Sequence, residues 1–503
     1  MARMHHGEVI SLDKINKTLN EMGLRNTNLL IVATPPVLTG LTGFGFMFQD
    51  LQIEPDSRLP ISDATIDSLI KLGETMEDPG APEFDSKIPS AYTYFGQFLN
   101  HEITLETESD KVVDISEGYF APMTRNDLSQ ALKNGRTPTL DLDSVYGTAT
   151  NGWPIPKQCN SLLLGPCAET GNRPQGKGIM NDLRRQPRSD NPDADRKAII
   201  GDARNDENLV ISQLHVAFVH AHNTLVAGGR NFAEAKKTLI QHFQWLVIHD
   251  FLRRIANPGI VDRVLESGNQ FYKPIACDPY MPLEFSAGVF RFGHSMVRMS
   301  YNYNEFHTEV GLLDLFDATS FRGDQFKEFE QIPDHWIIDW KRFVDGPNFA
   351  RRIDTRLVEP LRSLRDSHGS ALTGRKASLA VRNLLRGYLL RLPTGQRVAR
   401  AIGVEVLSPE DLKRTAANPD QAEVLQQSGF LEQTPLWYYI LAEASRGETL
   451  GPVGSTIVAE VLVGATRISK HSILNEANWY PTLGKEPGVF RLSDLFNLGN
   501  GWA

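Results

Sequence analysis

Cysteine is scarce in this chain. Only 3 of its 503 residues are cysteines, and no Cys-x-x-Cys motif occurs. Small secreted folds stapled by disulfides use many more, so this fold must depend on its hydrophobic core, and 41% hydrophobic residues suffice to build one. Cys159 and Cys167 flank a short loop and are near enough in sequence to pair, but their spacing does not decide whether they do.

Acidic residues outnumber basic ones, and long hydrophobic runs are few. The formal net charge is −9, which argues against a nucleic-acid partner because phosphate binding needs a basic surface. Residues 28–48 are apolar, but Pro35, Pro36 and several glycines interrupt them, so we expect no membrane span. No apolar segment typical of a signal peptide opens the chain. We expect a soluble protein whose export, if it occurs, follows a non-classical route.

Strand patterns are rare, and Gly/Ser linkers and fixed-period repeats are absent. Helical periodicity dominates, which predicts a mainly α fold with very little β structure. The clearest helical patterns cover residues 209–226, 232–255, 379–390 and 453–462.

No composition shift divides the chain into several domains. We predict one large domain over residues 85–503, with residues 1–84 as an N-terminal extension that packs on it. The extension should contain a short amphipathic helix near residues 11–22 and an apolar loop at residues 40–46.

The aromatic stretch from Tyr94 to Thr104 carries polar side chains at helical spacing. In a helix, Gln97 and His101 lie on one face, one turn apart, and Glu102 points elsewhere. In an isolated helix such a histidine is more often a hydrogen-bonded core residue than a ligand. The stretch becomes a candidate site only if the rest of the chain supplies partners.

A second candidate is the segment from residue 137 to residue 147. Thr137, Thr139, Asp141 and Asp143 occupy alternate positions, which face one side in an extended loop. Such a loop suits a hard cation, since calcium takes about six to eight oxygen ligands. The turn glycine and terminal glutamate of an EF-hand are missing, and a solvated acidic turn is the alternative.

Histidines recur further along the chain. His215 and His222 share a face of the predicted 209–226 helix, but His220 does not, so the three should not form a zinc site. His294 lies between Arg291 and Arg298, which we expect on the same side of a helix. Gly293 leaves room there for a flat group to approach the backbone.

Four of these motifs, taken in order, resemble a known family. They are residues 95–101, residues 137–147, the Gly-Asp-x-Arg-x-x-Glu motif at residues 201–207, and residues 290–294. Over residues 85 to 500 the chain resembles animal-type haem peroxidases of the peroxidase–cyclooxygenase superfamily, most of all their bacterial members. The resemblance implies a helical haem peroxidase that reduces hydrogen peroxide and oxidises halides, thiocyanate or phenols, and it suggests a role in the response to oxidative stress.

The resemblance also assigns roles around a haem iron. His294 would be the axial ligand, and Asn383 would accept the proton on its other ring nitrogen. His101 would be the distal base, Arg204 would stabilise the charge that develops as the O–O bond breaks, and Gln97 would hold water or a halide.

Haem attachment is expected to differ from that of mammalian members. Arg386 and Arg291 would pair with the propionates. Asn100 cannot form the ester that an aspartate makes there, and Asn208 excludes a sulfonium link to methionine. We therefore expect haem b with at most one ester bond, to Glu207.

By the same resemblance, residues 137–143 would form a calcium site. Thr137, Thr139 through its carbonyl, Asp141 and Asp143 would supply ligands, together with Glu102. Since Glu102 follows the distal histidine directly, the ion would tie the loop to the predicted helix.

Other functions remain open. Fatty-acid cyclooxygenases and dioxygenases of the same superfamily use a tyrosine three residues before the proximal histidine, where this chain has Arg291; Tyr301 and Tyr303 lie beyond that histidine. This favours peroxidase over oxygenase chemistry. The tripeptide Arg322-Gly-Asp324 is the only support for an adhesion protein on a peroxidase scaffold. A catalase-like scavenger would use the same residues as a peroxidase.

Overall fold

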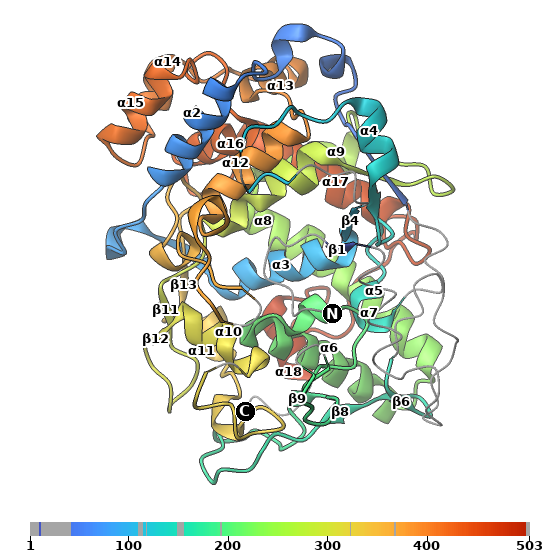
Figure 1. Cartoon of the computed structure of the whole chain (residues 1–503). Helices are drawn as coiled ribbons and strands as arrows, with labels where there is room; N and C mark the ends of the chain where they lie inside the picture. Colours follow the sequence, from blue (N-terminus) through green and yellow to red (C-terminus); the bar gives the residue numbers. More distant parts are fainter. Residues whose placement is uncertain are drawn as a thin grey trace.

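Helices dominate the computed structural model, as the sequence predicts (Figure 1). It describes residues 10–11, 42–108, 114–116, 118–147, 155–191, 194–321, 323–366 and 369–498. The α-helices are α2 (Asp63–Glu74), α3 (Ala91–Ile103), α4 (Arg125–Ala131), α5 (Asp143–Tyr146), α6 (Leu209–Ala227), α7 (Phe232–Trp245), α8 (Leu252–Ile255), α9 (Pro258–Ser267), α10 (Leu312–Ser320), α11 (Lys341–Val344), α12 (Leu379–Leu389), α13 (Gly395–Ile402), α14 (Pro409–Arg414), α15 (Pro419–Gln427), α16 (Leu436–Ala444), α17 (Pro452–Arg467) and α18 (Leu492–Leu498).

The strands are short. The largest sheet has the order β1-β4-β5-β2-β10, in which the outer pairs β1–β4 and β2–β10 are parallel and the inner pairs are antiparallel. The strands are β1 (Ile10–Ser11), β2 (Thr42–Gly45), β3 (Asp85–Pro89), β4 (Glu106–Glu108), β5 (Leu132–Asn134), β6 (Lys157–Gln158), β7 (Ser161–Leu162), β8 (Leu164–Gly165), β9 (Asp182–Leu183), β10 (Tyr280–Pro282), β11 (Ser300–Tyr301), β12 (Val310–Gly311) and β13 (Phe349–Arg351).

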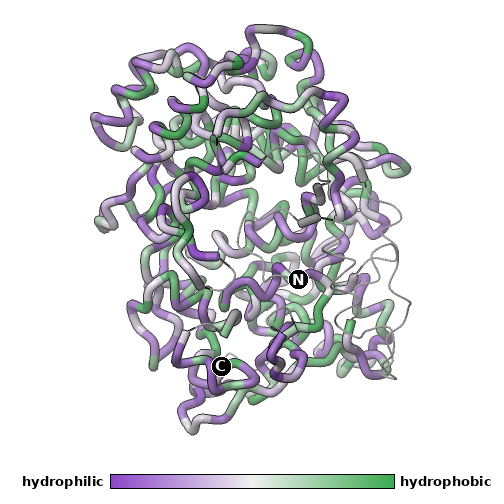
Figure 2. Tube along the Cα trace, viewed as in Figure 1, coloured by the Kyte–Doolittle hydropathy of each residue, from purple (hydrophilic) through white to green (hydrophobic). Residues whose placement is uncertain are grey.

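Apolar helices build the core around α3. Asn208 caps the N-terminus of helix α6, where its side chain accepts the N–H of Ile211 at 3.0 Å, and most side chains of this helix are buried. Helix α17 is equally buried. In Figure 1, α3 crosses the middle of the molecule, and Figure 2 shows the hydrophobic segments gathered inside.

Aromatic packing fixes the position of α3. Its first turn has no side-chain cap, so tertiary contacts must hold it. Phe98 stacks on Phe218 of α6, with ring centroids 4.8 Å apart, and Phe95 packs edge-on against Phe243 of α7 at 5.9 Å. These rings anchor the face of α3 opposite to its polar side chains.

Two local predictions were wrong. Residues 42–45 form strand β2 rather than an apolar loop, because β5 and β10 pair with them from distant parts of the chain. His294 ends a 3-10 helix, η7 (Val289–His294), which follows a π-helical turn, η6 (Glu284–Gly288), and Arg298 lies outside both. Arg298 instead pairs with Asp85 at 2.7 Å.

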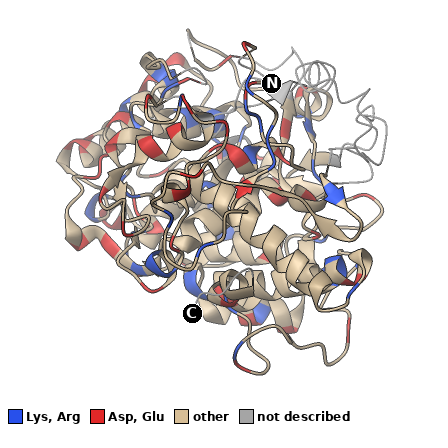
Figure 3. Ribbon diagram, turned by 90° about the horizontal axis from the view of Figure 1, so that it is seen from below, with Lys and Arg blue, Asp and Glu red and all other residues tan. Residues whose placement is uncertain are grey.

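Other predictions have different outcomes. The amphipathic helix predicted near residues 11–22 lies, apart from Ser11 in β1, outside the described residues. All three cysteines are free. No helix among the described residues is long and apolar enough to cross a membrane. Charges of both signs are interspersed over the outer elements (Figure 3). The domain boundary at residue 84 stays a prediction.

Candidate active site

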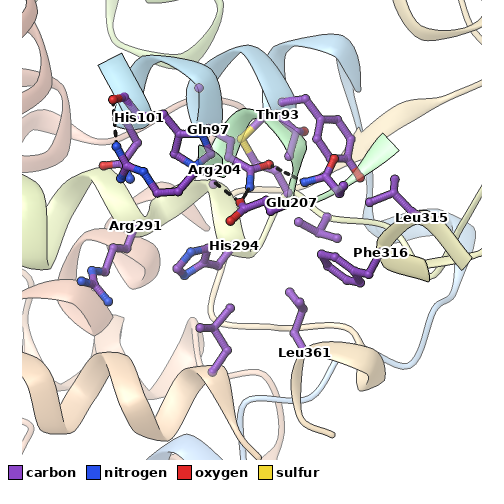
Figure 4. A pocket seen from close by; sticks show the side chains of 18 of the residues that line it. Thr93, Gln97, His101, Arg204, Glu207, Arg291, His294, Leu315, Phe316 and Leu361 are labelled. Atoms are coloured by element: carbon purple, nitrogen blue, oxygen red, sulfur yellow. Dashed lines mark hydrogen bonds and ion pairs between the residues drawn. The ribbon is translucent and has the colours of Figure 1, made fainter. Parts of the chain in front are cut away.

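A large cavity lies between α3 and the segment that ends at His294. Gln97, Asn100 and His101 of α3 line it, as do Arg204, Glu207, Arg291 and His294. Figure 4 shows Gln97, Arg204 and Glu207 on one side and His294 below them. The structure thus brings together residues that lie up to about two hundred positions apart in sequence.

A chain of hydrogen bonds determines the tautomer of His101. Its Nδ1 lies 2.9 Å from Oδ1 of Asn205, and Nδ2 of Asn205 lies 3.1 Å from Nδ1 of His215. An amide nitrogen only donates, so Nδ1 of His215 accepts, and the amide oxygen accepts the proton on Nδ1 of His101. Nε2 of His101 therefore keeps a lone pair and can accept a proton.

His215 supports this arrangement from the core. Burial lowers its pKa to about 4, although Asp202 opposes the shift, so the imidazole is neutral near pH 7. A neutral ring is needed because a protonated Nδ1 would compete with the amide of Asn205 as a donor. His215, which the sequence analysis considered only as a zinc ligand, thus orients a polar group of the cavity wall.

Arg204 is held firmly beside His101. Its Nε and Nη2 donate to Asp202 at 3.1 and 2.7 Å, and Nη2 also reaches the carbonyl oxygens of His101 and Thr104 at 2.9 and 2.6 Å. Its Nη1 makes no hydrogen bond to any described residue. Burial favours the neutral form of Asp202, but Arg136 and Arg204 outweigh it and hold the Asp202 pKa well below its ordinary value. The ionised carboxylate of Asp202 therefore holds Arg204 in place.

Glu207 meets the polar face of α3. Its Oε1 accepts a hydrogen bond from Nε2 of Gln97 and lies 3.4 Å from Nε2 of His101. Asn208 donates to Oε1 of Gln97 at 3.3 Å and so fixes the orientation of that amide. Gln97, His101 and Glu207 therefore converge on one point of the cavity wall.

On the opposite wall, His294 lies against Asn383 of α12. Nδ1 of His294 is 2.8 Å from Nδ2 of Asn383, and Oδ1 of Asn383 accepts from Arg291 at 2.8 Å. The amide thus presents its nitrogen to His294, whereas the predicted role requires its oxygen. An imidazole that binds a metal through Nε2 carries its proton on Nδ1. The amide of Asn383 must therefore flip, so that its oxygen faces Nδ1, before His294 can bind a metal through Nε2.

Arg291 and Arg386 share a carboxylate that the sequence did not single out. Glu106 of β4 lies 3.6 Å from Nη2 of Arg291 and 2.9 Å from Nη2 of Arg386. Burial lowers the pKa of Arg291, Glu106 raises it, and the nearby charges of Arg386 and Arg382 lower it further. Arg291 and Glu106 line this end of the cavity, and the charges of Arg386 and Arg382 behind them make it attractive to further anions.

The other end of the cavity is mostly apolar. In Figure 4, Leu315, Phe316 and Leu361 lie away from Arg291, beyond His294 and Glu207. The cavity is therefore amphipathic, with cations at one end and aliphatic and aromatic side chains at the other. Leu312, Leu313, Leu364 and Leu379 are among the other apolar lining residues, and Asp317 and Arg365 also line the cavity.

Residues 74–465 match the family model described as animal haem peroxidase. The chain belongs to the animal haem peroxidase family. A peroxidase-like protein from Margaritifera margaritifera is 26% identical over an alignment of 272 residues, and the match covers 43% of this chain and 32% of that protein. The match therefore spans about a third of the relative's length.

Solved structures share the fold. Peroxidase A from Dictyostelium discoideum superposes with a TM-score of 0.56 and 16% identity, over 87% of this chain and 88% of that one. A fatty acid alpha-dioxygenase from Arabidopsis thaliana gives 0.54 and 14%, over 92% and 81%. The predicted family and its helical fold are confirmed. At such low sequence identities, the similarity to these solved structures shows a shared fold and nothing more.

The family implies haem, and the cavity suits it. Haem has two carboxylates at one edge and apolar substituents at the other, which matches the two ends of the cavity. A Cβ built on Gly293 would meet no atom within 4 Å, so a flat group has room beside His294. The buried hydroxyls of Thr93 and Ser286, both in the cavity wall, have no hydrogen-bond partner among the described residues.

The predicted calcium ligands lie close to α3. Glu102 is buried and accepts the backbone N–H groups of Asp143 and Ser144 at 2.6 and 2.9 Å. Burial, Glu102 and Asp141 raise the pKa of Asp143 to about 8, which shows carboxylates gathered without enough positive charge. Thr139 Oγ1 is buried with no hydrogen-bond partner among the described residues.

Other features of this loop limit the fit. Asp141 accepts from Ser469 at 2.6 Å, and the Thr137 carbonyl accepts the N–H of Thr139 at 2.8 Å. The described part of the chain holds no cluster of three or more His, Cys, Asp or Glu side chains arranged for a metal. The oxygen-rich donor set suits a hard cation, and its occupancy stays a prediction.

Sequence reasoning missed Asn205, Asp202 and Glu106. Asn205 follows Arg204 directly, and Asp202 was part of the recognised motif, so the motif carried a signal for both. Glu106 had no such signal, because its partners lie 185 and 280 positions further along the chain.

Proposed function

We propose that this chain is a haem-dependent peroxidase that reduces hydrogen peroxide and oxidises a small donor, such as a halide, thiocyanate or a phenol. One observation carries the proposal. The hydrogen bonds from His215 through Asn205 leave Nε2 of His101 able to accept a proton, beside a fixed arginine and across the cavity from His294. A peroxidase needs such a base together with a cation.

The residues that would hold haem b follow from the cavity. His294 would bind the iron once the amide of Asn383 turns its oxygen to Nδ1. Arg291 and Arg386 would pair with the propionates in place of, or together with, Glu106. Bound haem would supply the redox-active iron at which peroxide is reduced.

The chain's own polar groups would then manage protons and charge. His101 takes a proton from one peroxide oxygen at Nε2 and returns it to the leaving oxygen. Arg204 stabilises the negative charge on that oxygen, and its Nη1 is the nitrogen available for this contact. Gln97, fixed by Asn208, would hold a water molecule or a halide.

Glu207 offers one covalent link to haem. Its carboxylate is in the cavity wall and contacts Gln97 and His101. We propose a single ester bond there, since Asn100 cannot supply a second. Mass spectrometry of a proteolytic digest should find a haem-modified peptide that contains Glu207; unmodified peptide alone would mean that haem is held without a covalent bond.

The visible absorption spectrum tests the function. The purified protein should show a Soret band that changes within milliseconds of adding one equivalent of hydrogen peroxide and recovers when bromide or a phenol is added. His101→Ala should keep the Soret band and slow its response to peroxide by about 10²- to 10⁴-fold. A wild-type band that ignores peroxide would rule out peroxidase turnover, and no band after haem is supplied would contradict the role of His294.

A fatty-acid oxygenase is the second candidate. The apolar end of the cavity and the fold shared with a fatty acid alpha-dioxygenase favour it. Against it, the position three residues before His294 holds Arg291, which is engaged with Asn383 and Glu106. Oxygen uptake with linoleate or arachidonate, in the absence of peroxide, would reverse this ranking. The adhesion alternative rests on Arg322, which lies outside the described residues.

A further inference from the structure

Four buried aromatic side chains form a row that leads away from the cavity. Tyr94 of α3 lines the cavity, and its ring centroid lies 5.7 Å from that of Tyr301 in β11. Tyr303 follows at 6.2 Å from Tyr301, and Trp336, in the 3-10 helix η8 (Asp334–Trp336), at 5.7 Å from Tyr303. Each side chain is at most 3% exposed. The row links the cavity to another face of the core.

The far end of the row is close to solvent. The ring of His307 stacks on Trp336 with centroids 3.8 Å apart, and its Nε2 lies 2.8 Å from Nδ1 of His335. His307 and His335 are half-buried, and the neighbouring Phe306 is 45% exposed. Burial and then His335 lower the pKa of His307 to about 4, so this end carries a neutral imidazole at pH 7.

Packing does not explain why Tyr303 is a tyrosine. Its hydroxyl is buried and has no hydrogen-bond partner among the described residues. Leaving such a group unpaired destabilises the folded state, and phenylalanine would avoid this cost with the same ring packing. A phenol differs from a phenyl ring in one other respect, because it gives up an electron much more readily.

We propose that Tyr94, Tyr301, Tyr303 and Trp336 form an electron relay to a second donor site at the surface around Phe306 and His307. The proposal rests on the proposed function, because peroxide reduction in the cavity is what draws electrons along the row. The relay serves phenols or aromatic amines that are too bulky to enter the cavity. Glu305 and Glu309 are exposed beside Phe306, so neutral or cationic donors are favoured over anions.

The electrons and protons balance over one turnover. Hydrogen peroxide takes up two electrons and two protons and becomes two water molecules. Two phenol molecules at the surface each lose one electron and one proton and become phenoxyl radicals. The two protons that the phenols lose go to solvent, and the formation of water in the cavity takes up two protons in return. Each relay residue is oxidised and then reduced, and ends unchanged.

Tyr303→Phe is the decisive variant. It keeps the ring that packs in the row and removes only the unpaired hydroxyl, so the fold should be retained. Tyr438→Phe is the control, since Tyr438 is equally buried but lies outside both the row and the cavity wall. Its hydroxyl donates to Oε1 of Gln421 at 2.8 Å, so this variant tests the loss of a buried phenol and of its hydrogen bond. Two donors are compared, a free phenol and the same phenol held on cross-linked dextran beads by a linker too short to enter the cavity.

Holoenzyme with haem should oxidise both donors. Tyr303→Phe should lower the oxidation rate of the bead-bound phenol by about tenfold or more and leave the rate with the free phenol within about twofold. Without a donor, peroxide and a spin trap should label Trp336 in the wild type and not in Tyr303→Phe, as mass spectrometry of peptides shows. Tyr438→Phe should match the wild type in each assay.

The contrary results are distinct. No oxidation of the bead-bound phenol by the wild type, or equal rates for Tyr303→Phe and the wild type, would overturn the relay while free-phenol oxidation still upheld the peroxidase. A wild-type Trp336 that takes up no spin trap would also overturn it. A Soret band that does not respond to peroxide would remove the proposed function and the relay together.

Discussion

At the scale of single residues, Asn205 decides which nitrogen of His101 faces the cavity. Asn205→Ala removes the acceptor for Nδ1–H, and we expect the rate of reaction with peroxide to fall by about 10- to 100-fold, as for other partners that orient a histidine. The rate is measured by stopped-flow absorption at equal haem content. If Asn205 acts through His101, the double variant His101→Ala/Asn205→Ala should react no more slowly than His101→Ala alone. Additive losses would mean an independent role for Asn205.

Glu106 gives the second prediction at this scale. Its carboxylate competes with the haem propionates for Arg291 and Arg386. Glu106→Gln should therefore bind haem more tightly, by about tenfold, which corresponds to about 1.4 kcal/mol. Titration of the haem-free protein with haemin measures the dissociation constant, and Glu309→Gln, at an exposed glutamate, is the control. Weaker binding by Glu106→Gln would show that the carboxylate helps to hold the arginines in place.

These residues also show how far sequence reasoning reaches. His101, Arg204 and His294 could be identified from sequence because each lies in a short motif that resembles the corresponding motif of the family. Glu106 was missed because its partners come from α12 and η7, and contacts between distant segments have no local signature. The amide orientation of Asn383 was likewise invisible, since it depends on Arg291.

At the scale of elements, the long helices were predictable from periodicity, and their ends agree closely with α6 and α12. The segment before His294 was not, because π-helical and 3-10 turns present much the same apolar pattern as an α-helix. Strand β2 was missed for another reason. Only two or three of its residues pair with β5 and with β10, which come from distant parts of the chain. Tertiary pairing rather than local propensity therefore makes this strand.

The loop at residues 137–143 and helix α3 form a unit that calcium would tighten. With calcium at about 100 times its dissociation constant, the unit should gain about 2.7 kcal/mol if the ion binds only the folded chain. Thermal unfolding with calcium or with a chelator measures this, and chelation should also lower peroxidase activity. Asp141→Asn removes one charged ligand and should abolish the difference. Full activity after chelation, with no calcium by elemental analysis, would contradict the site.

At the scale of the whole molecule, Glu284 joins the N-terminal part of the chain to the segment that carries His294. Its carboxylate accepts the N–H groups of Met47 and Phe48 at 2.9 and 3.1 Å. Burial raises its pKa to about 7, although these two hydrogen bonds oppose the shift. The folded state therefore holds this proton more tightly than the unfolded state does.

The sign of the pH dependence follows from that difference. The stability contributed by protonated Glu284 is complete below about pH 4.5 and is lost as the pH rises through 7, by about 3 kcal/mol in all. Buried histidines such as His215 act in the opposite direction between their lowered pKa values and pH 6.5, so the wild-type slope alone is a mixture. The informative quantity is the unfolding free energy of the wild type minus that of Glu284→Gln, from denaturant titrations at several pH values. It should fall by about 3 kcal/mol from pH 4.5 to pH 8, whereas a difference independent of pH would show that Glu284 is ionised throughout and that its hydrogen bonds to Met47 and Phe48 outweigh its burial.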